Sequence, residues 1–275
     1  MRLMLDKNKQ NIFSFSKIST YTNCPQKYKI NYIDEVRKVN ESVEAFMGKR
    51  VHEVLDWLYK EKNQIGHFFT VDLLLEKYEK LWLEKWHDNI YSANVPRKYK
   101  IKIKSKDLVY QNGLKCLVNY YNRYRPNFHQ DIIETEIKCK TVIGDYSFFG
   151  VIDRLDKINN DTYEIYDYKT GKKTISKYSA SNDLQLIIYL SAIKEKYKDC
   201  KKVVLSWYYL YTNEIVSIEH SLEKIEELKS KIIKIILDIE NDKQFYPKES
   251  LLCEWCYFWE ECDVKSISNP AIKLI

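Results

Sequence analysis

The stretch G-V-I-D-R-L-D-K-I-N-N-D-T-Y-E-I-Y-D-Y-K-T-G, residues 150–171, decides the fold class. It predicts two consecutive strands, because runs rich in β-branched and aromatic residues flank the turn-forming residues 159–161. Side chains two positions apart in a strand lie on the same face. We therefore expect Asp167 and Lys169 to point the same way, and Asp153 to converge with Asp167 if the two strands pair.

The pattern on either side of this stretch predicts an α/β fold with a mixed central β-sheet flanked by helices. Alternating apolar residues predict strands over 131–142, 146–157, 162–169, 201–211 and 214–218. Helical spacing predicts helices over 41–59, 71–86, 105–124, 184–197 and 221–239, and two short pieces over 16–33. We expect a single domain, 1–275, made of N-terminal helices 14–59, a helical insertion 60–128, a core 129–220 and a C-terminal helix with a cysteine segment 221–275.

Composition excludes several classes of protein. Hydrophobic residues make up 45% of the 275 residues and charged residues 31%, and only six glycines occur, so collagen-like and linker sequence are excluded. The longest strongly apolar run, 203–211, is far shorter than the roughly twenty residues of a membrane helix. The first ten residues are too charged for a secretion signal, so we expect a soluble, cytoplasmic protein with no membrane partner. The net charge of +6 permits a nucleic-acid partner without requiring one.

Two strand carboxylates beside a lysine predict a metal site. Asp153 and Asp167 would offer the oxygen ligands that a hard divalent cation such as Mg²⁺ or Mn²⁺ prefers. Lys169 would then orient a water or neutralise charge on a phosphoryl group. The alternative is an ordinary Asp-Lys pair exposed at the end of a strand.

Three residues on predicted helices can complete this site. Gln185 and Tyr189 are four positions apart and share one face of the helix that follows the second strand. His52 lies four residues after Gly48, where a closely packed backbone turn could carry a ligand. A single histidine on a helix is more often structural, and we interpret the other four histidines as structural or exposed.

The seven cysteines divide into two groups. Cys116, Cys139 and Cys200 are scattered and are expected to be small buried hydrophobic residues. The other four, three clustered near the end of the chain and one near its start, suggest a four-thiolate site: Cys24, Cys253, Cys256 and Cys262. On spacing alone, zinc and an iron–sulfur cluster both remain candidates, although only one short C-x2-C pair is present.

The order of the motifs resembles a known family. The matching segments are S-x-S-K-I-S-T-Y-T-N-C-P-x-K-Y (14–28), G-K-R-V-H (48–52), G-V-I-D-R (150–154), D-Y-K-T-G (167–171), Q-L-I-I-Y (185–189) and C-x2-C-x5-C (253–262). This arrangement is similar to RecB-like nucleases of the PD-(D/E)XK superfamily, in the iron–sulfur subgroup. That subgroup includes the CRISPR-associated RecB-like exonucleases and the nuclease domain of AddB.

The resemblance implies roles for individual residues. Metal would be bound by His52, Asp153, Asp167 and the backbone carbonyl of Tyr168, with Lys169 as the catalytic lysine. Gln185 and Tyr189 would lie at the edge of the site and position the lysine or the nucleic-acid strand. The four cysteines would hold a [4Fe–4S] cluster, with zinc as the alternative, in a terminal clasp on a restriction-endonuclease-like core. Many relatives have Glu where this chain has Asp167.

These observations lead to one expectation of function and two alternatives. We expect a metal-dependent DNA nuclease, an exonuclease on single-stranded DNA or DNA ends, acting in repair, recombination or defence. The alternatives are a spacer-processing nuclease in CRISPR adaptation and a non-catalytic nucleic-acid-binding iron–sulfur protein. No G-x-x-x-x-G-K-[ST] motif occurs, so a helicase or CRISPR-adaptation protein would be a separate partner. Basic and aromatic residues expected to track DNA are Arg97, Lys98, Tyr99 and Lys100.

Overall fold

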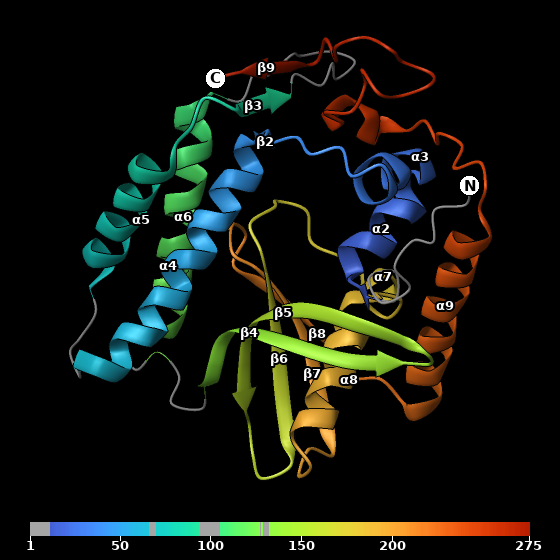
Figure 1. Ribbon diagram of the computed structural model, residues 1–275. Helices are drawn as coiled ribbons and strands as arrows, with labels where there is room; N and C mark the ends of the chain where they lie inside the picture. The colour runs from blue at the N-terminus through green and yellow to red at the C-terminus, as the bar shows by residue number, and fades with distance from the viewer. Residues whose placement is uncertain (1–11, 66–69, 94–104, 127, 129–131) are drawn as a thin grey trace.

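A central six-stranded sheet organises the protein, as the computed structural model in Figure 1 shows; the structure describes residues 12–65, 70–93, 105–126, 128 and 132–275. Its strands run in the order β1-β5-β6-β7-β8, and β4 also pairs with β5. Their bounds are β1 Ile12–Phe13, β4 Ile132–Ile143, β5 Tyr146–Lys157, β6 Thr162–Lys169, β7 Lys202–Tyr209 and β8 Glu214–Ile218. Two of the pairings, β1 with β5 and β6 with β7, are parallel and the others antiparallel, so the prediction of a mixed sheet is confirmed.

The helices form two groups on opposite faces of this sheet (Figure 1). One group packs against the face that includes Ile165: α2 Phe15–Asn23, α8 Gln185–Lys196 and α9 Leu222–Asn241. The other group packs against the face that includes Tyr166: α4 Val43–Ile65, α5 Val71–Lys85 and α6 Lys106–Tyr124. Short helical segments complete the description: α3 Pro25–Tyr28, the π-helix η1 Lys29–Ile33, α7 Lys177–Ala180 and the 3₁₀ helix η2 Leu251–Trp255.

Alternation along β6 explains how one strand serves two cores. Tyr163 and Ile165 are buried in the core with α8, whereas Tyr166 and Tyr168 are buried in the core with α4 and α6. Neighbouring strand residues face opposite sides of a sheet, so a strand covered on both faces is apolar at almost every position. The predicted burial of the helix after this strand is also confirmed, because most of α8 is buried.

A second, three-stranded sheet is absent from the sequence-based prediction. It consists of β2 Glu41–Ser42, β3 Ile90–Ala93 and β9 Ile272–Leu274, in the order β2-β3-β9. Residues 60–128 are therefore not helical throughout, and the helix expected over 41–59 begins two residues later and continues to Ile65. Strands of two to four residues are too short to show alternation, and their partners are distant in the sequence. The proposed DNA-tracking residues 97–100 lie outside the described residues.

A buried arginine connects the sheet with α4 and α6. Arg154 is fully buried, and its guanidinium pairs with the Asp156 carboxylate through Nε–Oδ1 at 2.7 Å and Nη2–Oδ2 at 2.5 Å. Its Nη1 donates to the hydroxyls of Tyr120 at 2.9 Å and Tyr59 at 3.3 Å. Removing one partner of such a buried pair costs about 3–5 kcal/mol, because the remaining charge is left without compensation.

Within the described ranges, no helix combines the length and apolar character needed to cross a membrane.

Close packing of α5 on α6 depends on Gly113, and this gives a test of the fold. A Cβ at Gly113 would lie 2.1 Å from the hydroxyl oxygen of the buried Tyr78. We expect Gly113→Ala to lower the free energy of unfolding by about 1–3 kcal/mol through overpacking, although alanine has a helix propensity about 1 kcal/mol better than glycine. Urea unfolding measures the change.

The matched control is Gly171→Ala, because a Cβ at Gly171 meets no atom within 4 Å. It should leave the stability within about 0.5 kcal/mol of the parent protein. Adding Tyr78→Leu to Gly113→Ala should recover part of the loss. Equal stability of the two alanine variants would contradict the packing argument.

Candidate active site

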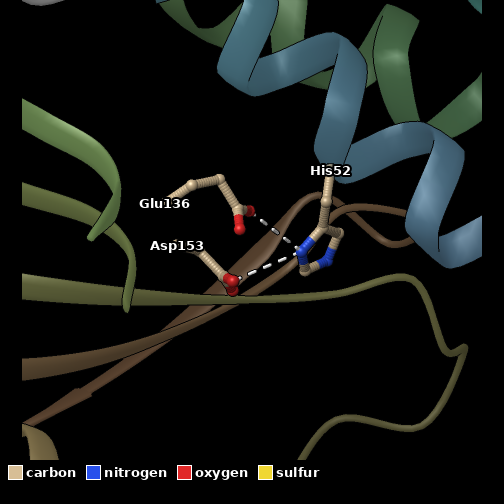
Figure 2. Close-up of side chains that lie close together, drawn as sticks. All are labelled: His52, Glu136 and Asp153. Atoms are coloured by element: carbon tan, nitrogen blue, oxygen red, sulfur yellow. Dashed lines mark ion pairs between the residues drawn. The ribbon is translucent and has the colours of Figure 1, made fainter. Parts of the chain in front are cut away.

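Three potential metal ligands from three different elements converge at one end of the sheet (Figure 2). His52 reaches down from α4, while Glu136 and Asp153 project from β4 and β5. The His52 Nδ1 atom lies 3.3 Å from Asp153 Oδ1 and 3.9 Å from Glu136 Oε1. One ligand atom from each residue lies within 4.8 Å of the other two, and all three side chains are half-buried.

The β4–β5 hairpin places Glu136 opposite Asp153. Thr135 pairs with Arg154 and Ile137 with Ile152, so the intervening residues face each other across the two strands. The register shifts just before this point, between residues 132 and 134, and Glu136 has a φ of 50°. A left-handed backbone is uncommon for glutamate and is found preferentially at functional sites.

Sequence reasoning missed Glu136, but a signal for it was available. The turn predicted at 143–145 implies that Ile143 pairs with Tyr146, as it does in the structure. Counting back along this hairpin from the turn places Glu136 opposite Asp153. The predicted turn therefore contained the missing ligand.

A close approach of α4 to the end of β6 carries His52 to the site. A Cβ on Gly48 would lie 3.3 Å from Thr170 Oγ1, a separation tighter than most Cβ contacts. Glycine thus lets the helix backbone approach the residue that follows the catalytic-lysine candidate. This agrees with the expectation that a closely packed turn carries the histidine.

Asp167 and Lys169 lie on the same face of β6, as predicted, and form an ion pair with a Nζ–Oδ2 distance of 2.5 Å. Asp167 follows directly in the register that pairs Arg154 with Tyr166, so it lies opposite Asp153. Its carboxylate is directed to Lys169 and Gln185, and it does not belong to the three-residue group around His52.

The Tyr168 backbone is in direct contact with the site. Its N–H donates to Asp153 Oδ2 at 2.6 Å, while the other oxygen of that carboxylate faces His52. The N–H and C=O of one strand residue point to the same neighbouring strand, so the Tyr168 carbonyl also faces β5. The metal role that the resemblance gives to this carbonyl stays a prediction.

Gln185 and Tyr189 lie together beside the ion pair. The Gln185 amide donates to Asp167 Oδ1 and to the Tyr189 hydroxyl, both at 3.0 Å, and its Oε1 lies 3.5 Å from Lys169 Nζ. A Cβ on Gly150 would lie 2.5 Å from the Tyr189 ring, so glycine is required where this ring crosses β5. The shared helix face predicted for the two residues is confirmed.

Electrostatics at the site favour a bound cation. Burial, with the Asp153 charge, raises the pKa of Asp167 to about 6 against the opposing charge of Lys169. Burial and the charge of Asp153 also raise the pKa of Glu136. Burial alone would lower the pKa of His52, but the Asp153 carboxylate, helped by Glu136, outweighs it and raises that pKa to about 9. Without another cation, the histidine therefore carries the positive charge that these carboxylates require.

The donor set fits a hard divalent cation. Two carboxylates and an imidazole lie within reach of one ion, and Asp167 is adjacent. Bound there, such a cation would polarise a phosphodiester and lower the pKa of a water. Lys169 lies on the same end of the sheet, where its ammonium can face the same phosphodiester.

Four cysteines line a separate cavity of about 270 Å³, formed by the junction of α2 with α3 and the segment around η2. They are the four predicted to act together: Cys24, Cys253, Cys256 and Cys262. In the part of the chain that the structure describes, no three of their Sγ atoms lie within 4.8 Å of one another. Backbone N–H groups of Lys248 and Ser250 approach two of the sulfurs, at 3.5 and 3.4 Å. Of the other cysteines, Cys116 and Cys139 are buried as expected, whereas Cys200 is only half-buried.

A mixed sheet with Asp and Asp-x-Lys on adjacent strands, faced by a helical histidine, defines the class of α/β nucleases. The profile of the PD-(D/E)XK nuclease superfamily matches residues 12–263, and the chain belongs to this superfamily. This confirms the family predicted from the motifs.

Curated relatives are bacterial proteins named as one of the subunits of an ATP-dependent helicase/deoxyribonuclease. The protein from Clostridium perfringens (strain SM101 / Type A) is 30% identical over 261 residues, which cover 83% of this chain and 22% of the relative. The protein from Clostridioides difficile (strain 630) is 29% identical over 218 residues, covering 70% of this chain and 18% of the relative. The chain thus spans about a fifth of the length of these relatives.

A solved structure shares the fold. It is a protein from Eubacterium rectale described as a candidate exonuclease, with a TM-score of 0.50, 11% identity, and coverage of 93% of this chain and 92% of that chain. At this identity the similarity concerns the fold alone.

The pKa of His52 predicts how metal binding depends on pH. A metal ligand must be neutral imidazole, so binding releases the proton that His52 holds below pH 9. We expect Mn²⁺ affinity to rise by up to about tenfold per pH unit between pH 7 and 9. Calorimetry in buffers of different ionisation enthalpy measures both the affinity and the released proton.

His52→Gln should bind Mn²⁺ more weakly and lose most of this pH dependence. The matched control is His87→Gln, because His87 pairs with Glu41 at 3.2 Å, away from the site. An affinity that stays constant from pH 7 to 9 in the parent protein would exclude His52 as a ligand.

Proposed function

We propose that the protein is a metal-dependent DNA nuclease, an exonuclease that acts on single-stranded DNA or DNA ends in repair, recombination or defence. The observation that carries this proposal is the convergence of His52, Glu136 and Asp153 beside the Asp167–Lys169 pair. An inert nucleic-acid-binding relative would not need these charged groups to lie together at one half-buried position.

The proposed mechanism gives each group one task. His52, Glu136, Asp153 and Asp167 would hold one or more divalent cations, which supply an activated water and polarise the phosphodiester. Lys169 would stabilise charge that develops on the phosphoryl oxygens. Gln185 bridges Asp167 and Tyr189, which supports a role in holding the carboxylate and the lysine in position.

A helicase partner fits the same proposal. The curated relatives are named as helicase/deoxyribonuclease subunits, and this chain matches about a fifth of their length. The chain has no Walker A motif, so a motor that unwinds DNA would be supplied by another chain or segment.

The four cysteines are proposed to hold a [4Fe–4S] cluster with a structural role. A zinc ion binds thiolates at about 2.3 Å and so draws four sulfurs close together. The wider separation of these sulfurs around a cavity of about 270 Å³ favours a larger group. The N–H groups directed at Cys24 and Cys253 suit thiolate sulfur. Such a cluster would join segments 229 positions apart.

Cleavage assays test the nuclease. End-labelled single-stranded DNA should be degraded with Mn²⁺ or Mg²⁺ and remain intact with EDTA. Lys169→Ala and Asp153→Ala should each lower kcat by about 10³-fold or more, since each removes a group that stabilises the transition state. Lys231→Ala, an exposed lysine on α9, is the matched control. Cleavage by Lys169→Ala at the parent rate would refute the mechanism.

Circular DNA tests the dependence on ends. A circle of the same sequence should resist degradation under conditions that digest the linear strand. Equal cutting of the circle would make the protein an endonuclease.

The cysteine proposal predicts a brown protein when it is purified without oxygen, with broad visible absorbance that bleaches on reduction. Cys24→Ala should lose this absorbance and lower Tm by about 5–10 °C, which corresponds to ~2–3 kcal/mol for a chain of this size. Cys200→Ala is the matched control, because Cys200 is half-buried outside the cavity. A colourless protein containing one zinc per chain would overturn the cluster.

A further inference from the structure

Two lysines from different elements meet at one tyrosine near the end of the central sheet. Lys115 comes from α6 and Lys172 from the loop after β6, and each ammonium lies 4.2 Å from the centroid of the Tyr211 ring. Both lysines are exposed, and Tyr211 is half-buried. The three groups thus bring two positive charges and a hydroxyl donor to one surface position.

The turn that carries the tyrosine is held in place by α6. The Asn119 amide donates to the carbonyls of Leu210 and Tyr211, both at 2.9 Å. Arg123 donates from Nε to Asn213 Oδ1 at 2.8 Å, at a residue whose φ is 61°. Both anchoring side chains follow the α6 lysine at four-residue intervals and share its face of the helix. The geometry is therefore fixed before any ligand arrives.

The two ammonium groups are not neutralised locally. Counting only residues that the structure describes, no carboxylate lies within 4 Å of either, whereas Lys49 and Lys60 on α4 each pair with a carboxylate at 2.6 Å. Their charges act on the phenol, because interaction with Lys172, supported by Lys115, lowers the pKa of Tyr211. Like charges held together without a counter-charge repel each other, and a bound anion removes that repulsion.

This position is continuous with the candidate active site. The Leu210 N–H donates to the carbonyl of Lys169 at 2.8 Å, so the turn begins beside the catalytic-lysine candidate. Lys172 follows Lys169 by three residues, and the space around the intervening Gly171 is open.

We propose that Lys115, Lys172 and Tyr211 form a binding site for an internal backbone phosphodiester of the substrate strand, next to the phosphodiester that is cleaved. Lysine ammonium groups bind phosphate as compact charges, and a phenol hydroxyl can donate to a phosphate oxygen. The inference rests on the proposed nuclease function for its substrate. Its role is to hold the strand in register, and it takes no part in bond cleavage.

DNA binding without cleavage tests this site separately from the nuclease. We would measure the Kd of a fluorescein-labelled 20-nucleotide single strand in EDTA at several salt concentrations, for the parent protein and for Lys115→Gln/Lys172→Gln. The control is Lys231→Gln/Lys234→Gln, which removes two exposed charges from α9. Thermal unfolding should give the same Tm for all three proteins.

We expect the site variant to bind about 10–100-fold more weakly than the parent, and the control about as tightly as the parent. The slope of log K against log salt should fall by about 0.7 for each lost phosphate contact. With metal present, the site variant should raise KM and leave kcat within about twofold, because binding that is uniform along the reaction is lost. Tyr211→Phe should show a smaller loss of affinity.

Several outcomes would overturn the inference. These are equal Kd values and salt slopes for the site and control variants, no binding by the parent protein, or a loss of affinity only on strands with a 5′-phosphate, which would indicate a terminal phosphate. Failure of the nuclease is a different result: the parent binds DNA through these lysines and cleaves nothing with any divalent metal.

Discussion

The arrangement of the protein depends on one buried ion pair, between Arg154 and Asp156, and on the tyrosine hydroxyls around it. A charge with no exposed surface must be neutralised and hydrogen-bonded, and here the partners come from β5, α4 and α6. The helical layer therefore cannot shift along the sheet without leaving a guanidinium N–H unpaired. This fixes α4, and with it His52, relative to the strands that carry the carboxylates.

The same residue connects this network with the metal site. Arg154 follows Asp153 directly, so the two side chains leave β5 on opposite faces. The hydroxyl of Tyr168 bonds to that of Tyr120 at 2.9 Å on the helical side, while the Tyr168 N–H holds the Asp153 carboxylate. One strand pair thus couples the packing of the tyrosine-rich core to the geometry of the candidate ligands.

The sequence was most informative where periodicity is strong and pairing is local. The strands 146–157 and 162–169 have the bounds that alternation predicts, and the facing of Asp167 and Lys169 follows from them. The small β2-β3-β9 sheet could not be predicted, because its strands are too short to show a period and its last partner is nearly 180 residues away. Glu136 was missed for a different reason: an isolated glutamate in a strand carries no signal until the hairpin register is considered.

The small sheet also sets the order in which the protein can fold during synthesis. β2 leads directly into α4, and β3 holds β2 on one side and β9 on the other. The Ile275 N–H bonds to Ile90 as well, so the support at the start of the histidine helix includes residues at 272–275. While this region is still inside the ribosome, the helix lacks part of its anchor although the central sheet has already emerged. A nascent chain is thereby kept from completing a DNA-cutting centre until its last described residues are released.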